Sequence, residues 1–383
     1  MSAPVPQSFL AHFQTLSDPR KLTGNTVHTF LDILMIAVCG ALCGADYWTD
    51  VAAFGHAQEA WFRGFLELPA GIPSHDTFTT TFRRIDPEQF QRSFVSWVSE
   101  LADLLPGDVV AIDGKTLRHS YDRQDSKAAI HMVSAWASQQ SLVLGQVKTE
   151  AKSNEITAIP QLLEVLELTG CLVTIDAMGC QKAIAEKIRG RGADYLLALK
   201  GNHPTLYHTV IEHFSLEHAT TLGRHDVDFD WSEERNRDRD EVRRCWVEHD
   251  LSWLPQREEW PDLQAIVRIE SVRTQHGETT REDRYYLSSA SFDAETFLKK
   301  TRTHWSIENS LHWVLDVAFC EDACRIRKGH GAENFAILRH VAVNLLQPDR
   351  RRSGGIRAKR LQAGWDVRYR EQILYEGGFD FGT

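Results

Sequence analysis

Hydrophobic residues recur along this chain with two different periods, and the change between them falls near residue 107. Before it the apolar residues have helical spacing, most clearly in Phe30–Leu42. Ser74 and Asp86 each precede a further helical run, where a short polar side chain can cap the helix. Pro106-Gly107 then ends the region. The pattern predicts an all-helical N-terminal domain over residues 1–106.

After this boundary the pattern becomes that of buried strands separated by helices. Apolar runs rich in Val, Ile and Leu end at turn residues. The expected strands are Val109–Asp113, His131–Ala137, Leu142–Thr149, Cys171–Asp176 and Tyr195–Lys200, and the expected helices are Ser153–Glu167, Gln181–Arg189 and Pro204–Phe214. The order βββαβαβα is that of the ribonuclease-H-like fold, in which the first and fourth strands are neighbours. We therefore predict an α/β protein with a ribonuclease-H-like core, whose first part covers residues 107–223.

The rest of the chain is expected to form an insertion in this core, the second part of the core, and a C-terminal tail. Glu241–Glu248, Leu263–Thr274 and Arg284–Ser288 have the pattern of strands in a separate sheet, so residues 224–290 are expected to form a β-rich insertion. Asp293 then starts a helix that reaches Trp305 and continues beyond it. Residues 291–346 complete the core, and residues 347–383 are expected to form a basic C-terminal tail.

Three acidic residues stand where these elements would bring them together. Asp113 and Asp176 end the first and fourth strands, and Glu308 follows in the helix. Grouped carboxylates repel one another, and hard divalent cations such as Mg²⁺ prefer oxygen ligands. The leading hypothesis is metal-assisted phosphoryl chemistry on nucleic acid. Taken singly, each acid is equally consistent with a turn residue or a solvated helical residue.

The distribution of charge matters more than the net charge of −10. From Arg325 to Arg370, twelve lysines and arginines stand against three acids, a net charge of +9. This stretch could hold phosphates, or its arginines could pair with neighbouring acids on a solvated surface. The tract Arg235–Arg244 contains basic and acidic residues in almost equal number. Its arginines could pair with acids of the same tract, or Arg237 and Arg239 could contact DNA.

The expected compartment is the cytoplasm, with no membrane partner. The seven cysteines include no CxxC pair and no zinc-binding spacing. The N-terminus has no basic start of a signal peptide. The most apolar segment, Ile33–Leu42, is too short to span a bilayer.

Three blocks resemble those of the DDE transposases, in particular the H-repeat-associated (ISAs-type) insertion-sequence transposases of bacteria. They are Ala111–Lys115, Thr174–Ala177 and His304–Trp313, and further similar stretches are Ile72–Phe78, Leu199–His203, Leu315–Val317 and Glu321–Arg325. The blocks occur in order on the expected elements, with the β insertion between the second and third. The resemblance extends from about Phe9 to Leu346.

The resemblance implies a DNA transposase with Asp113, Asp176 and Glu308 as catalytic triad and metal ligands. Such an enzyme cuts at the terminal inverted repeats of an insertion sequence and joins the 3′-OH ends to target DNA. It uses two Mg²⁺ ions, for which Mn²⁺ may substitute, and acts on double-stranded DNA as a homodimer in the bacterial nucleoid. The alternatives are a catalytically decayed or repurposed DNA-binding protein, and a ribonuclease-H-like nuclease that cuts without joining.

One signature of related cut-and-paste transposases is missing. They carry Tyr, Arg and Lys seven before, four before and seven after the glutamate, where this chain has Thr301, His304 and Leu315. The arginine's role could pass to Arg302, His304 or a more distant residue.

The expected DNA contacts lie beside the strand ends, around the glutamate, in the basic stretch and on an N-terminal helix, Ser74–Ile85, suited to the major groove. They are Lys115, Arg118, Lys200, Asn202, His304, Trp305, Arg325, Arg327, Lys328, Arg83 and Arg84. Competing interpretations are surface ion pairs for Lys115 and Lys200, core packing for Trp305, and N-terminal helices that bind no DNA. Trp313 is expected in the core.

Overall fold

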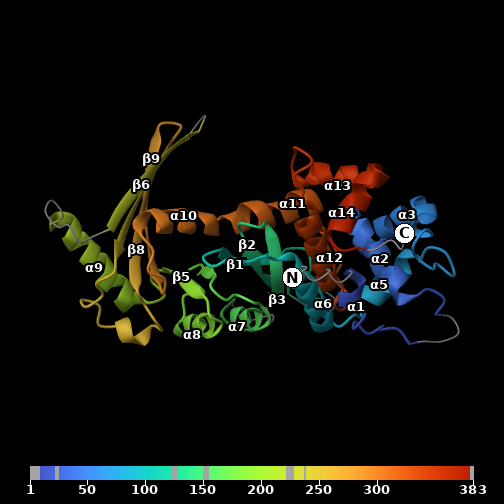
Figure 1. Cartoon of the computed structure of the whole chain (residues 1–383), viewed down its shortest axis with the longest axis horizontal. Helices are drawn as coiled ribbons and strands as arrows, with labels where there is room; N and C mark the ends of the chain where they lie inside the picture. Colours follow the sequence, from blue (N-terminus) through green and yellow to red (C-terminus); the bar gives the residue numbers. More distant parts are fainter. Residues whose placement is uncertain are drawn as a thin grey trace, which may run out of the picture.

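A nine-stranded mixed sheet runs through the computed structural model, and helices cover both faces of its central part (Figure 1). The structure describes residues 9–21, 26–121, 128–149, 155–220, 228–236 and 239–379. The strands are β1 (Val109–Leu117), β2 (Ile130–Ala137), β3 (Leu142–Lys148), β4 (Leu172–Ile175), β5 (Asp194–Leu199), β6 (Asp228–Asn236), β7 (Arg239–Glu248), β8 (Ala265–Gln275) and β9 (Glu278–Ser288).

The helices fall into an N-terminal group, a group along the sheet and a C-terminal group. They are α1 (Phe9–Phe13), α2 (Phe30–Leu42), α3 (Trp48–Ala57), α4 (Glu59–Phe62), α5 (His75–Phe82), α6 (Pro87–Leu101), α7 (Glu155–Val165), α8 (Lys182–Gly190), α9 (Pro204–Thr220), α10 (Ala294–His304), α11 (Trp313–Phe319), α12 (Gly331–Leu346), α13 (Ile356–Trp365) and α14 (Val367–Glu376), with short turns η1 (Arg257–Glu259), η2 (Glu308–His312) and η3 (Glu321–Ala323).

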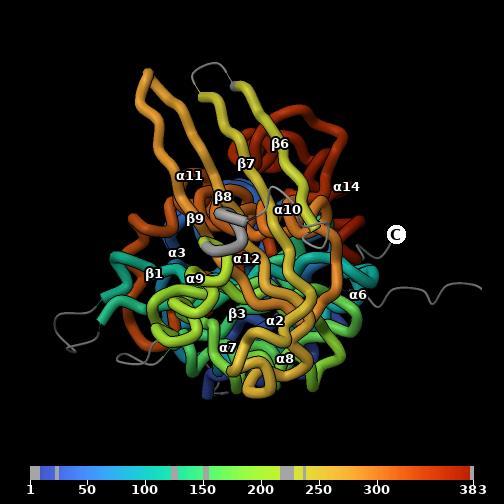
Figure 2. The backbone as a smooth tube through the Cα atoms, turned by 90° about the vertical axis from the view of Figure 1, so that its left-hand side faces the viewer, coloured from blue at the N-terminus to red at the C-terminus, as the bar shows by residue number. Residues whose placement is uncertain are grey.

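The strand order is β3-β2-β1-β4-β5-β9-β8-β7-β6. The first and fourth strands pair in parallel, with Ile112 opposite Ile175, so the predicted neighbours are confirmed. The expectation of a separate sheet for residues 224–290 is wrong, because β9 pairs with β5 and continues the same sheet. Figures 1 and 2 show β6–β9 projecting as a long arm beyond the other strands. Local patterning cannot reveal this continuity, since it depends on pairing with a distant strand.

Alternate residues of the central strands enter two different cores, as the period of a strand requires. Val109, Leu172 and Leu196 pack with α10 on one face, together with Phe297 and Leu298. The residues next to them along each strand belong to the larger core, which includes α7 and α8. In Figure 1, α10 accordingly runs above the central strands and α7 and α8 lie below them. By this alternation Asp113 and Asp176 face the α10 side.

The predicted N-terminal helices are present, with one boundary corrected. Phe30–Leu42 is helical as expected, and Ser74 caps α5 by accepting a hydrogen bond from the Thr77 N–H. However, α5 ends at Phe82, so Arg83 and Arg84 lie in the turn after it rather than on a helix. The expected start of the helix Ser153–Glu167 lies outside the described residues, and α7 is described from Glu155. Within the described ranges, no helix is both long and apolar enough to cross a membrane.

The N-terminal helices share one core with the last helices of the chain. Phe78 and Phe82 belong to the same hydrophobic cluster as residues of α12, α13 and α14. Buried Asn334 of α12 donates hydrogen bonds to the carbonyls of Phe82 and Ile85, at 2.7 and 3.0 Å. The two ends of the sequence therefore pack together beside the sheet, as Figure 1 shows.

Part of the basic C-terminal stretch is folded into the interior. The expected tail contains α13 and α14, and Lys359, Arg360 and Arg370 of these helices are buried. The Arg360 guanidinium donates hydrogen bonds to the carbonyls of Ala41 at 2.9 Å and Ala318 at 2.6 Å. Cations stabilise the carbonyl ends of helices, so this arginine ties the ends of α2 and α11 together.

A buried asparagine offers a test of how α12 closes the edge of the sheet. Asn344 accepts the Val143 N–H at 2.8 Å and donates to its carbonyl at 2.9 Å. Asn344→Ala leaves both backbone groups without a partner, so we expect a loss of about 2–4 kcal/mol in the free energy of unfolding. Urea denaturation followed by circular dichroism measures it. The exposed Gln275→Ala is the control, and an equal effect of both would contradict this role of Asn344.

Candidate active site

Two aspartates lie where the pairing of β1 with β4 ends, although the expectation that Asp113 ends its strand is wrong, because β1 continues to Leu117 along β2. Asp113 in β1 follows Ile112, which stands opposite Ile175, and Asp176 is the residue after Ile175. The Asp176 carboxylate accepts the backbone N–H groups of Met178 at 2.9 Å and Gly179 at 3.3 Å. This local turn orients Asp176 where β4 ends.

The helix that carries Glu308 is anchored to the sheet on either side of Asp113. His304, the last residue of α10, shares a 2.9 Å hydrogen bond with the Thr174 hydroxyl of β4. The Trp136 indole of β2 donates to the Ser306 hydroxyl at 3.1 Å. His304 and Ser306 precede Glu308 by four and two residues. Their hydrogen bonds to the sheet therefore hold the start of η2, with Glu308, close to Asp113.

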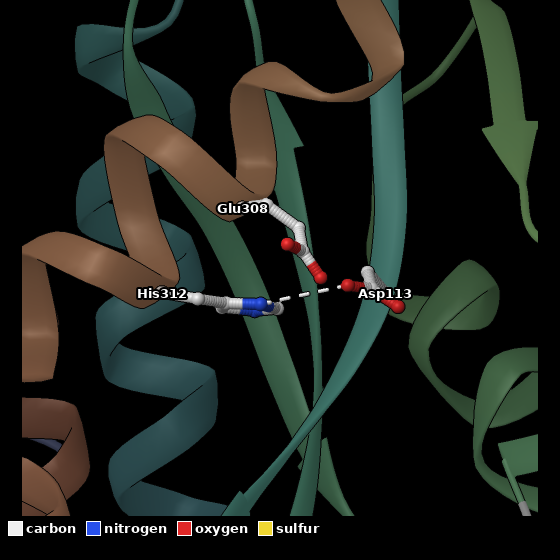
Figure 3. A group of neighbouring side chains, drawn as sticks. All are labelled: Asp113, Glu308 and His312. Atoms are coloured by element: carbon white, nitrogen blue, oxygen red, sulfur yellow. Dashed lines mark ion pairs between the residues drawn. The ribbon is translucent and has the colours of Figure 1, made fainter. Parts of the chain in front are cut away.

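The helix widens at this point into a π turn. Residues Glu308–His312 form η2, in which the Trp313 N–H donates to the Glu308 carbonyl, before α11 continues. Such turns within helices occur frequently at functional sites. Here the π turn directs Glu308 and His312 toward Asp113 (Figure 3).

These three side chains form a possible metal-binding group. One ligand atom each from Asp113, Glu308 and His312 lies within 4.8 Å of the others. Asp113 is half-buried, Glu308 exposed and His312 buried. Sequence reasoning identified the two acids and missed His312. The available signal was its position four residues after Glu308, on the same face of a helix.

The electrostatics of the site are dominated by burial and like charge. Burial, followed by the charges of Glu155, Asp176 and Glu308, raises the pKa of Asp113 to about 7. Glu155 reaches the site from the start of α7 and bonds His131 Nε2 at 2.8 Å. Four carboxylates around one buried position suit a divalent cation, which would offset their repulsion. The donor set therefore fits a divalent cation.

Histidine behaves differently in the same surroundings. Burial, reinforced by the charge of Lys115, lowers the pKa of His312 to about 4. The imidazole is therefore neutral near pH 7, and a lone pair on one of its nitrogens is free to act as a ligand.

Lys115 lies beneath this site in an ion-pair cluster. Its ammonium is 2.7 Å from Asp316, 3.0 Å from Glu321 and 3.3 Å from Asp322. Glu321 is also 3.5 Å from Arg339 of α12. Of the two interpretations of Lys115 given above, a DNA contact and a surface ion pair, the structure shows the ion pair. The cluster is mostly buried, however, and does not lie on the surface. The cluster joins β1 to the elements that follow Glu308.

The other expected DNA contacts are scattered around the site. Lys200, Arg325 and Lys328 are exposed. Several others have protein partners: Arg118 is 3.1 Å from Asp322, Asn202 donates to the Ala177 carbonyl at 2.7 Å, and Arg327 donates to the His119 carbonyl at 2.9 Å. Arg239 pairs with Glu241, whereas Arg237 lies outside the described residues.

The aromatic residues around Glu308 are more exposed than expected. Trp305 is exposed and packs against the guanidinium of Arg284, 4.8 Å from its ring centre. The core position expected for Trp313 is wrong, because its side chain is 61% exposed. Leu311 and Trp313 are two positions apart and therefore lie on opposite sides of the helix, with Leu311 on the buried side.

The raised pKa of Asp113 predicts a specific pH dependence of stability without metal. The folded chain binds this proton more tightly than the unfolded chain, so the stabilisation is lost as pH rises from the ordinary value toward about 7. In a chelator we expect the melting temperature to fall between about pH 4 and 7, and Asp113→Asn to flatten that part of the curve. Exposed Asp103→Asn is the control. A slope unchanged by Asp113→Asn would refute the prediction.

Lys115 and Arg118 form a matched pair, because both contact Asp322. The Lys115 side chain is 10% exposed and that of Arg118 is 76% exposed. Lys115→Met leaves Asp316 without its cation and Glu321 with Arg339 alone, and we expect a loss of about 3–5 kcal/mol in unfolding free energy. Arg118→Met should cost less than about 1 kcal/mol. Chemical denaturation of both variants measures this, and equal losses would rule out the buried-cluster interpretation.

Comparisons with known proteins agree with this arrangement. Residues 105–345 match the family model described as "Transposase DDE domain", and residues 10–98 match "DDE_Tnp_1-associated". The chain is 41% identical over 372 residues to "Putative transposase YncI" of Escherichia coli O157:H7, covering 96% of this chain and 94% of the relative. It is 39% identical over 379 residues to "H repeat-associated putative transposase YhhI" of Escherichia coli strain K12, covering 97% and 99%.

A shorter relative is named for lost activity. "Inactive transposase YbfQ" of Escherichia coli strain K12 is 30% identical over 71 residues, which is 18% of this chain and 83% of that protein. The domain model spans most of the chain, and the two long relatives align over nearly all of it. The chain therefore belongs to the DDE transposase family, in its H-repeat-associated group.

Proposed function

We propose that this protein is an active DNA transposase that cuts at the terminal inverted repeats of an insertion sequence and joins the freed 3′-OH ends to target DNA. The observation that carries the proposal is the grouping of Asp113 with Glu308, while Asp176 follows the neighbouring strand β4 and its charge acts on Asp113. The order β3-β2-β1-β4-β5 supports assigning these strands to a ribonuclease-H-like core. Membership of the DDE family supports the same chemistry.

Asp113, Asp176 and Glu308 are the proposed ligands of two divalent ions, Mg²⁺ with Mn²⁺ as a substitute. Bound there, the ions lower the pKa of an attacking water or 3′-OH and stabilise the departing oxygen. Asp113, half-buried between the other acids, is placed to be shared. Glu308 is exposed, so a phosphodiester can approach its side of the site. No covalent enzyme intermediate is required.

The surroundings of the triad suggest how DNA is held. Trp305 and Trp313, both exposed, flank Glu308 and offer flat apolar surfaces for bases displaced near the cut. Lys200 and Asn202 follow β5 at the same end of the sheet, and Asn202 supports the loop after Asp176. Arg118, Arg325, Arg327 and Lys328 are further proposed phosphate contacts.

Recognition of the transposon ends is assigned to the N-terminal helices, residues 1–106. Arg83 and Arg84, in the turn after α5, are the proposed contacts there. Cutting of two ends together requires two active sites, so we propose a homodimer on double-stranded DNA. Two other functions remain distinct outcomes of the test: binding without cleavage, which the inactive relative makes relevant, and cleavage without joining.

The decisive experiment uses a labelled duplex that carries the terminal repeat of the element encoding this chain. We expect Mg²⁺-dependent cutting at the repeat end and joining to a plasmid target. Asp113→Asn, Asp176→Asn and Glu308→Gln should each reduce cleavage by on the order of 10³-fold, because each removes several kcal/mol of transition-state stabilisation. Arg118→Gln is the control outside the triad, expected to weaken DNA binding only modestly.

The three functions give different results in this assay. Repeat binding without cutting, in Mg²⁺ and Mn²⁺ alike, would reject catalysis and favour a DNA-binding role. Cutting without joined products would favour a nuclease. Cleavage that survives any of the three triad substitutions would reject the assignment of that residue.

A further inference from the structure

We propose that His312 is a ligand of the divalent metal bound at Asp113 and Glu308, so that one metal position has a nitrogen donor and favours Mn²⁺ over Mg²⁺. The inference deepens the proposed function and rests on its metal site. It adds a residue that the three-carboxylate scheme does not contain.

The separation between His312 and Asp113 is close to that of two ligands of one metal ion. His312 Nδ1 lies 3.5 Å from Asp113 Oδ2 (Figure 3). This exceeds the usual range for a charge-assisted hydrogen bond, about 2.7–2.9 Å. Two ligands at right angles on an octahedral ion, with bonds of about 2.1 Å, lie about 3.0 Å apart, so a movement of about half an ångström would bring the two donor atoms to one ion. The observed distance therefore leaves room for an ion between the side chains.

The position of the imidazole is fixed by the fold rather than by a partner. The His312 residue is only 9% exposed, and within the described residues its Nε2 atom is buried with no hydrogen-bond partner. The π turn holds it on the same helix as Glu308, and neighbouring Leu311 is fully buried. The nitrogen that faces the carboxylate is Nδ1, which lies 3.5 Å from Asp113 Oδ2, so Nδ1 is the proposed donor to the metal.

The other histidines close to the site are already occupied. His131 bonds Glu155 through Nε2 at 2.8 Å and Thr116 through Nδ1 at 2.9 Å. His304 shares its Nδ1 with Thr174 at 2.9 Å. Neither belongs to the group of ligand atoms around Asp113. Of these three histidines, His312 is the one directed at the carboxylates without a hydrogen bond to them.

A nitrogen donor changes which metal the site prefers. Mg²⁺ takes oxygen ligands almost exclusively, whereas imidazole suits first-row transition metals, whose affinity for mixed nitrogen and oxygen sites is higher. His312→Gln replaces the nitrogen by a carbonyl oxygen of similar reach. The substitution should therefore move selectivity from Mn²⁺ toward Mg²⁺ without emptying the site.

The test is metal binding to the full chain, with no DNA and no turnover. Metal-free wild type, His312→Gln, Asp113→Asn and His340→Gln are titrated with Mn²⁺, and free Mn²⁺ is followed by electron paramagnetic resonance. Competition with Mg²⁺ gives the selectivity, and pulsed measurements detect coupling to the ¹⁴N of a bound imidazole. His340 is the matched control, because it is a buried histidine outside the ligand group.

We expect ¹⁴N coupling in the wild type and in His340→Gln, and its loss in His312→Gln. The Mn²⁺ to Mg²⁺ affinity ratio should fall roughly tenfold or more in His312→Gln. Absence of ¹⁴N coupling in the wild type, or its persistence in His312→Gln, would overturn the proposal. If His312→Gln fails to fold, judged by its thermal melt, the wild-type spectrum still decides.

Asp113→Asn separates failure of this inference from failure of the proposed function. Loss of Mn²⁺ binding in Asp113→Asn with unchanged binding in His312→Gln would leave the carboxylate site standing and reject the histidine ligand. Equal Mn²⁺ binding by wild type and Asp113→Asn would reject the metal site itself, and this inference with it.

Discussion

Repulsion among carboxylates is the constraint on which the rest of this structure depends. Asp113 sits where burial and three neighbouring acids oppose its ionisation. Such a cluster does not assemble by its own attraction, so other interactions must hold it in place. The pairing of β1 with β4 sets the two aspartates side by side, and the anchors at Thr174 and Ser306 bring Glu308 over them.

Cations behind the site supply part of that support. Lys115, two residues beyond Asp113, is paired with Asp316 and Glu321, which follow Glu308 in the chain. Arg360 joins the end of α11 to the end of α2 through backbone carbonyls. These positive groups point away from solvent, toward acids and helix ends. Some basic residues of the chain therefore bind acids and carbonyls inside the protein, whereas others are exposed on its surface. The amino-acid composition alone does not show which residue belongs to which group.

The long helical path from α10 through η2 to α11 links the arm, the active site and the end helices. One end of α10 packs beside β6 and β7, and Arg302 near its other end pairs with Glu234 of β6. At the π turn, His312 is buried beside Asp113 and Trp313 faces solvent. The π turn therefore carries Glu308 and His312 on the side of the helix that faces Asp113.

The sequence by itself determined the elements and the acids that they carry. Alternation and turn residues located β1 to β5, and the capping residues Ser74 and Asp86 located helix starts, because these signals are local in the chain. The tertiary structure alone decided that β9 extends the same sheet, that Lys115 pairs with Glu321 and Arg360 is buried, and that His312 joins Asp113 and Glu308. Each of these depends on contacts between residues far apart in the sequence, or on a π turn, neither of which a regular local period encodes.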